Sequence, residues 1–355
     1  MVTAATQHLL ATVRDTSSSA ADMRAAAQSL LSAVAQATVA EANAALAQLA
    51  EHILLDDLSR AAFLALVCGA LVEQGCDPSV LNQPLNQRLR ALLEASARLA
   101  DACIARIPEL EGEDNPAETF AKARQQVADA MPLEDAAWQA LDLFWRPAIA
   151  VFSVSRAARA EARGLRDLAA KIANYHEGGH WLQLMLSVLD DEPLLAIEPH
   201  TRLGMLARMS GIVDNFQLHV LLMDTFPHAG ILPRRRVPKR VADVARGLGP
   251  QQTDDTVTGN WNLYTWKAIE PDLRLPDPSD YGASVYWIWN EGSPEDIPVF
   301  EGYRVVLLGP ASYSRSWGCQ RMFDKLPASL DVERRLAKSE VTDWLQRMAA
   351  AKGVS

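Results

Sequence analysis

Residues 38–54 read TVAEANAALAQLAEHIL, and this stretch sets the fold class of the first part of the chain. Thr38 followed by Glu41 is a capping-box pattern, in which the two side chains satisfy free backbone N–H groups at the start of a helix. Leu46 and Leu49 then recur at the three- and four-residue spacing of one helical face. The stretch therefore predicts an amphipathic helix.

Helical patterns of the same kind continue on both sides of this stretch. The helices expected beyond it cover residues 56–74, 86–107, 117–130, 133–144, 157–189 with a break near Gly164, and 201–225. The segment 111–116, EGEDNP, is acidic and rich in helix breakers, so it predicts a loop or a domain boundary. The first region, 1–110, is predicted to be a helical bundle or a repeat-like helical stack.

The pattern changes near residue 233, where Pro, Gly and Trp become frequent. Residues 285–289 and 303–308 are β-branched and aromatic and predict strands, and residues 331–350 predict a final helix. We expect a mainly α protein with a small, Trp-rich α+β region at its C-terminal end. The expected domains are a helical bundle (1–110), a helical domain (111–230) and the α+β region (231–355). Strands are expected only after about residue 250.

The composition is that of an ordinary globular protein and limits the function classes. Of 355 residues, 49% are hydrophobic and 22% charged, and the formal net charge is −10. An acidic chain with a pI near 5.2 is not expected to bind nucleic acid or an anionic membrane. The sequence lacks a secretory signal pattern and a membrane-spanning apolar run.

The cysteine spacing and the Ala and Arg content indicate the location of the protein and the source of the gene. The four cysteines have no paired metal-ligand spacing, which favours buried, reduced thiols and a cytoplasmic location. The abundance of Ala and the excess of Arg over Lys indicate a GC-rich bacterial gene.

One string, His176-Glu177-Gly178-Gly179-His180, spells H-E-x-x-H. On a helix, residues four apart lie on one face, so both imidazoles could bind a single zinc ion. Glu177 could then take a proton from a zinc-bound water and act as general base. The string predicts the zinc site of a metallohydrolase, with His176 and His180 as ligands and Zn²⁺ as cofactor.

A different interpretation makes His176 and His180 hydrogen-bonded core histidines on a long helix. Two mid-helix glycines are unfavourable there, each costing about 0.8–1 kcal/mol relative to Ala. That cost would be explained if the glycines let a substrate backbone approach the metal.

A third zinc ligand is expected from a neighbouring element. Asp214 is an ionisable group in the apolar segment 201–225, and a buried carboxylate needs a partner. The partner could be the metal, Arg208, or solvent on a polar face. Glu198, His200 and His219 stay open as alternative ligands.

Residues 173–224 resemble the ImmA/IrrE-type zinc peptidases, in which an acid on a second helix is a metal ligand and a Leu-Leu-Met-Pro stretch follows it. Here Asp214 precedes Leu221-Leu222-Met223-Asp224. The acid is Asp rather than Glu, its register is displaced by one residue, and Asp224 replaces the proline. The resemblance implies zinc-dependent peptidase activity with Asp214 as a ligand.

Two features of the last third have alternative explanations. Five of the nine tryptophans follow residue 260, and they could form an aromatic binding cleft or fill the core of a small domain. The basic run 234–240, RRRVPKR, could bind an acidic partner or another part of this acidic chain, or form a solvated loop.

The sequence thus predicts a cytoplasmic zinc-dependent hydrolase, most simply a peptidase acting on a protein or peptide with metal-activated water. The alternative prediction is a non-enzymatic helical interaction or scaffold protein whose histidines are structural.

Overall fold

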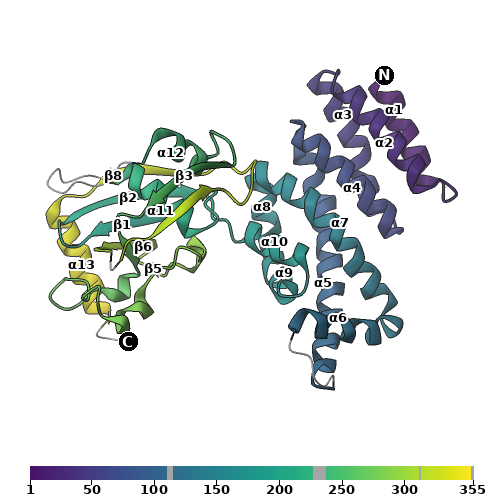
Figure 1. Ribbon diagram of the computed structural model, residues 1–355. Helices are drawn as coiled ribbons and strands as arrows, with labels where there is room; N and C mark the ends of the chain where they lie inside the picture. Colours follow the sequence, from purple (N-terminus) through teal and green to yellow (C-terminus); the bar gives the residue numbers. More distant parts are fainter. Residues whose placement is uncertain (110–114, 227–236, 312, 353–355) are drawn as a thin grey trace. The chain divides into compact units, whose positions relative to one another are not determined.

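The computed structural model describes residues 1–109, 115–226, 237–311 and 313–352, and the chain forms two compact units, Met1–Leu186 and Ser187–Ser355 (Figure 1). The protein is mainly helical, as expected, with its sheet in the C-terminal part. The division differs from the three expected regions, because the boundary falls after Leu186 and not near residues 111 and 231.

The first unit contains only helices within its described residues, as the sequence predicted. Its α-helices are α1 (Val2–Arg14), α2 (Ala20–Val34), α3 (Val39–Ala50), α4 (Leu58–Glu73), α5 (Asn82–Arg106), α6 (Pro116–Val127), α7 (Pro132–Val154), α8 (Arg156–Ala162), α9 (Arg166–Ile172) and α10 (Glu177–Leu186). The capping box at the start of α3 is present: Thr38 N donates to Glu41 at 3.0 Å and Glu41 N donates to Thr38 at 3.3 Å. Most of the acidic segment 111–116 lies outside the described residues.

Helix α7 is central to this unit, because it packs against both α4 and α5. Gly69 of α4 lies so close to Pro147 of α7 that an added Cβ would meet the proline Cα at 2.9 Å. The close approach of the two backbones therefore requires glycine at this position.

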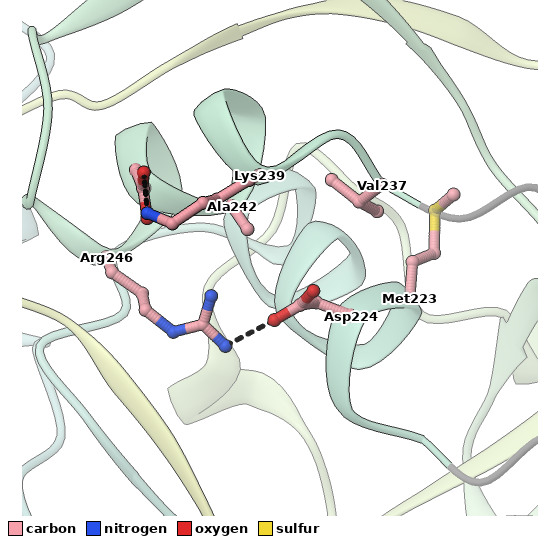
Figure 2. Close-up of a pocket in the computed structure, with 7 residues that line it drawn as sticks. Met223, Asp224, Val237, Lys239, Ala242 and Arg246 are labelled. Carbon is pink, nitrogen blue, oxygen red and sulfur yellow. Dashed lines mark hydrogen bonds and ion pairs between the residues drawn. The ribbon is translucent and has the colours of Figure 1, made fainter.

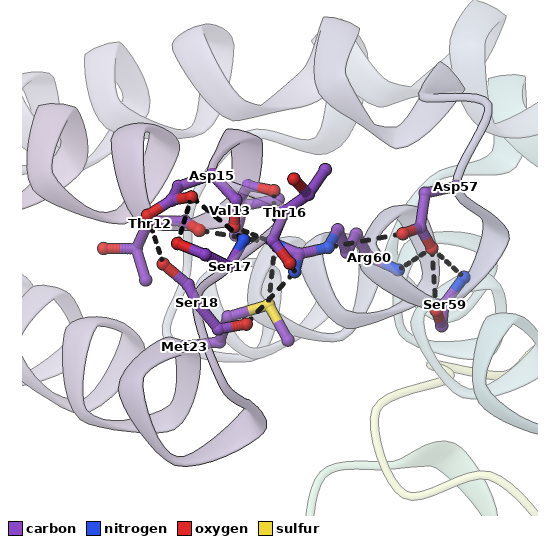
Figure 3. A network of polar contacts seen from close by, with 10 residues as sticks. All are labelled: Thr12, Val13, Asp15, Thr16, Ser17, Ser18, Met23, Asp57, Ser59 and Arg60. Atoms are coloured by element: carbon purple, nitrogen blue, oxygen red, sulfur yellow. Dashed lines mark hydrogen bonds and ion pairs between the residues drawn. The ribbon is translucent and has the colours of Figure 1, made fainter.

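A partly buried arginine of α4 binds the end of α1 and the loop that follows it (Figure 3). The Arg60 guanidinium of α4 donates to the carbonyl oxygens of Val13 at 2.8 Å and Asp15 at 2.9 Å, at the end of α1. It also donates to the carbonyls of Thr16 and Ser18 in the α1–α2 loop. Because the last carbonyls of a helix have no partner within the helix, one planar fork satisfies groups that would otherwise be unpaired.

We predict that Arg60→Lys lowers the free energy of unfolding by about 1–3 kcal/mol, since an ammonium cannot reproduce this fork. Arg90→Lys is the matched control, because Arg90 is about half exposed and only ion-pairs with Glu94 at 3.8 Å. The control should change stability by less than about 0.5 kcal/mol in urea unfolding. Equal effects of the two substitutions would contradict the structural role of Arg60.

The second unit is built on a mixed sheet in the order β4-β6-β1-β2-β8, with β5 paired to β6, while β3 and β7 form a separate two-stranded sheet. Strands β1 and β6 run parallel and their other pairings are antiparallel. The strands are β1 (Glu192–Glu198), β2 (Leu203–Ser210), β3 (Gln252–Thr258), β4 (Asn262–Tyr264), β5 (Val299–Phe300), β6 (Tyr303–Gly309), β7 (Ser316–Gln320) and β8 (Ser329–Arg335). The helices are α11 (Asn215–Thr225), α12 (Lys239–Arg246) and α13 (Lys338–Lys352).

Both faces of this sheet are covered. On one face Leu194 and Ala196 of β1 share a core with residues of α11 and α12. On the other face Leu195 and Ile197 share a core with residues of α13. Strands covered on both sides read as unbroken apolar runs and lose the alternation that marks a half-buried strand.

Several predicted elements are wrong, and for β1 and β2 the burial of both faces is the reason. The helix expected over 201–225 is strand β2 followed by α11, and β1 and β2 precede residue 250, before which no strand was expected. Met, Leu, Ala and Arg dominate β2, and these residues favour helices in isolation. Residues 331–335, expected to begin a helix, belong to β8.

The strand expected at 303–308 is confirmed as β6, but the one at 285–289 is wrong. The chain there forms a 3-10 turn ending at Tyr286, followed by a single bridge from Trp287 to Tyr264. Among the described residues, no helix combines the length and apolar character needed to cross a membrane.

Candidate functional site

The H-E-x-x-H string does not lie within one continuous helix. Helix α9 ends at Ile172, a turn follows, and α10 begins at Glu177. His176 is the residue before α10, and its carbonyl accepts the first helical hydrogen bond from His180 N at 3.1 Å. His176 therefore occupies the N-cap position.

Both ring nitrogens of His176 are engaged in hydrogen bonds. Nδ1 accepts from the Gly178 backbone N–H at 2.9 Å, as an N-cap side chain does. Nε2 lies 3.0 Å from the Trp138 carbonyl oxygen of α7. Because a carbonyl only accepts, Nε2 must carry the proton. Neither nitrogen retains a free lone pair for a metal ion.

The two histidines have different environments. His176 is only 3% exposed, and its ring lies edge-on to the Trp138 ring, with 4.7 Å between the two ring centroids. Burial lowers the pKa of His176, against the opposing effects of the Trp138 carbonyl and Asp142. His180 is exposed and its ring contacts Trp181. The two rings, expected to share one helical face, therefore differ, since only His176 is buried.

The two glycines of the string are explained by helix packing. A Cβ at Gly178 would meet Trp145 of α7 at 2.6 Å, and a Cβ at Gly179 would meet Ile172 of α9 at 2.5 Å. Approach of a substrate backbone is therefore not needed to account for them. Glycine at these positions lets α10 begin close against its two neighbours.

Asp214, expected as the third ligand, belongs to the second unit and caps α11. Its carboxylate accepts from Gln217 N at 2.7 Å. Burial raises the pKa of Asp214 to about 6, although hydrogen bonds from the backbone of Gln217 and Phe216 act in the opposite direction. The helix cap satisfies this carboxylate without a metal.

Two of the alternative zinc ligands, Glu198 and His200, have different environments. Glu198 is buried and accepts hydrogen bonds from Trp261 Nε1 at 3.2 Å and from Thr201. His200 is exposed in the turn after β1. Within the described residues, no group of three or more His, Cys, Asp or Glu side chains is arranged to hold a metal.

His219 of α11 is enclosed by tryptophans. Its ring centroid lies 6.0 Å from that of Trp261 and 5.1 Å from that of Trp317. Burial lowers the pKa of His219 to about 4, which outweighs the opposing effect of the Asn290 side chain. Trp261 itself is 5% exposed and belongs to the core between the sheet and α11. This cluster matches the interpretation of tryptophan as core filling, although Trp289 is 47% exposed.

The cysteines are all free and buried. Burial raises the pKa of Cys68 to about 12 and that of Cys319 to about 11. Nucleophilic catalysis by cysteine needs the thiolate, so these two thiols are unsuited to it at neutral pH.

The described part of the basic run pairs with the chain itself. Lys239 bonds Asp243 at 2.6 Å, and Arg240 forms a bidentate ion pair with Asp255. That ion pair lowers the pKa of Asp255 to about 2. Arg234 to Arg236 lie outside the described residues.

A cleft of about 520 Å³ lies beside α11 and α12 (Figure 2). Its charged groups neutralise one another: Arg246 bonds Asp224 at 2.6 Å, and Lys239 bonds Asp243. Met223, Val237 and Ala242 supply its apolar lining. The internal pairing leaves little charge to recognise a ligand.

No protein-family model, curated protein or solved structure matches this chain. What the structure defines is an all-helical unit followed by a unit with a mixed sheet covered on both faces.

We predict that Gly178→Ala lowers stability by about 1–3 kcal/mol, although alanine is the better helix former, because its Cβ would overlap Trp145. Gly164→Ala is the control, since an added Cβ there meets nothing nearer than Arg90 at 4.0 Å. The control should be neutral or slightly stabilising in thermal unfolding. A stabilising Gly178→Ala would contradict the packing explanation.

We predict that Asp214→Asn is more stable than the parent at pH 7, by about 1–2 kcal/mol, and that the difference disappears towards pH 4. Because the folded-state pKa of Asp214 is raised to about 6, the folded chain holds more protons than the unfolded chain between about pH 4 and 6. The parent therefore loses stability as the pH rises through that range, whereas Asn keeps the cap without ionising.

The comparison of two proteins cancels the contribution of His219, whose lowered pKa acts in the opposite direction. Asp57→Asn is the control, because the Ser59 hydroxyl lowers the pKa of Asp57 at the cap of α4. Because a lowered pKa stabilises the folded chain only when the carboxyl is ionised, Asp57→Asn should be less stable than the parent by an amount that stays constant above about pH 4. Urea unfolding between pH 4 and 8 measures both, and a pH-independent Asp214→Asn difference would refute the assignment.

Proposed function

We propose that this chain is a non-enzymatic interaction protein and that its H-E-x-x-H string starts a structural helix. The observation that carries the proposal is the double engagement of His176, with Nδ1 on Gly178 N and Nε2 on the Trp138 carbonyl. These bonds join α10 to α7, so the histidine has a complete structural task.

The surrounding groups support the same conclusion. Asp214 caps a helix, and Glu198 accepts from Trp261 and Thr201, so both carboxylates act in the fold. Burial raises the pKa of Cys68 and Cys319, so neither thiol supplies a nucleophile at neutral pH.

The helical unit also has a surface suited to a partner. A groove of about 310 Å³ lies where α2 and α4 end and α3 begins, lined mostly by small and apolar residues such as Val34, Val39 and Ala42. Val39 is 69% exposed. Exposed apolar residues around a groove are typical of protein-binding surfaces.

The alternative proposal is the zinc-dependent peptidase. Two exposed side chains of α10, Glu177 and His180, favour it, because they are open to solvent in the first turn of the helix. It requires His176 to give up one of its two hydrogen bonds and a third ligand to be recruited. The residues as arranged do not fit a three-ligand zinc site.

One pair of variants separates the two proposals. In the structural role, His176→Ala leaves a helix N-terminus uncapped and removes the hydrogen bond between α10 and the Trp138 carbonyl of α7, which should lower stability by about 1–3 kcal/mol. His180→Ala removes an exposed ring and should change stability by less than about 0.5 kcal/mol. The parent should bind zinc substoichiometrically after dialysis against zinc.

The peptidase proposal gives the opposite pattern. The parent should hold close to one zinc per chain, and both variants should lose it equally. Metal analysis together with urea unfolding of the three proteins distinguishes these results. One zinc per chain in the parent, lost in both variants, would overturn the structural proposal.

A further inference from the structure

A third cavity, separate from the H-E-x-x-H string in sequence, lies at one edge of the sheet in the second unit. It has a volume of about 210 Å³. Pro199 and His200 directly follow β1, and Leu308 and Pro310 lie at the end of β6. Because β1 and β6 are parallel, their carboxyl ends meet at this edge, which is where open sheets commonly bind ligands.

The lining is mostly rigid and apolar. Six of its nine residues are proline or leucine, and four of these are prolines: Pro199, Pro276, Pro278 and Pro310. Prolines have no backbone N–H, so they cannot donate hydrogen bonds to a ligand. Polar recognition must come largely from the three remaining side chains, His200, Arg274 and Asp277.

The loop that carries Arg274 and Asp277 is fixed to the sheet. Leu273 has a positive φ of 63°, and its carbonyl accepts from the Arg202 side chain at 3.3 Å. Leu275 lies so close to Gly309 of β6 that an added Cβ would meet its Cδ1 at 2.8 Å. A wall fixed in this way is preorganised, which reduces the entropy lost on binding.

The three polar side chains retain capacity for a ligand, unlike the paired charges of the cleft in Figure 2. Among the described residues, the Arg274 side chain pairs only with Asp272, at 3.8 Å, and it is 83% exposed. Asp277 Oδ1 accepts from Ser279 N at 2.8 Å and Ser279 Oγ at 2.6 Å, and no described residue donates to Oδ2. Among the described residues, none hydrogen-bonds the His200 ring.

We propose that this cavity binds a free α-amino acid with an apolar side chain. One guanidinium and one carboxylate in the lining match the carboxylate and ammonium of a zwitterion. The six apolar residues match the side chain. A cavity of about 150 Å³ holds a benzene-sized molecule, so 210 Å³ accommodates one ring or a branched aliphatic chain beside the charged groups.

The charge on Asp277 is secure at neutral pH. Hydrogen bonds from the Ser279 side chain and backbone lower the pKa of Asp277. The site therefore offers opposite fixed charges to the two ends of the zwitterion, and it does not depend on the role of the H-E-x-x-H string.

Isothermal titration of the full-length chain with L-valine, L-leucine and L-phenylalanine tests the proposal. At least one should bind with a Kd of about 1 mM or tighter. Two analogues of phenylalanine serve as ligand controls: 3-phenylpropanoate lacks the ammonium, and 2-phenylethylamine lacks the carboxylate. Each should bind at least about threefold more weakly.

Variants test the two charges separately. Arg274→Gln and Asp277→Asn should each weaken binding of the amino acid by about three- to tenfold. Asp277→Asn should not weaken binding of 3-phenylpropanoate, since that ligand has no ammonium. Arg334→Gln is the control, because Arg334 is also an exposed, ion-paired arginine, but lies on β8 away from the cavity lining. It should leave the affinity unchanged.

Three results would overturn the proposal. The first is that none of the three amino acids binds at a concentration about tenfold above the expected Kd, roughly 10 mM. The second is binding of 3-phenylpropanoate as tight as that of phenylalanine, which would indicate a simple anion site. The third is equal loss of affinity in Arg274→Gln and Arg334→Gln.

Discussion

The two-sided burial of β1 and β6 is the constraint on which the second unit depends. Four consecutive apolar residues in β1 and four in β6 cannot be left open to water on either face, so each face needs its own covering layer. Polar groups then hold those layers in position. The Gln217 side chain bonds the Ala245 carbonyl at 2.7 Å, joining α11 to α12, and Asn215 bonds the Trp289 carbonyl at 2.8 Å.

Features encoded by neighbouring residues could be predicted from the sequence. The capping box of Thr38 and Glu41 involves residues three apart and is present at the start of α3. The strand at Tyr303–Gly309 was found because β-branched and apolar residues follow one another there. Such signals survive folding because the stabilising contacts lie within the segment itself.

Features that depend on distant residues could not be predicted. The apolar run in β1 is compatible with a helix or a buried strand, and only its pairing with β2 and β6 decides between them. The spacing of His176 and His180 indicated one helical face, yet the Trp138 carbonyl, 38 residues earlier, fixes the His176 ring. The cavity near β1 is lined by His200 and by a loop more than 70 residues later in the chain, and no local pattern in the sequence indicated that they meet.

The burial of the thiols has a practical consequence for following motion in the native protein. Cys68 lies on α4 in the first unit and Cys319 on β7 in the second, and both thiols are buried in the folded protein. An alkylating reagent can reach either sulfur only when its own surroundings open transiently. The rates of modification of these two residues can be resolved by peptide mass. They would therefore report the rate of local opening in each unit independently, without any introduced probe.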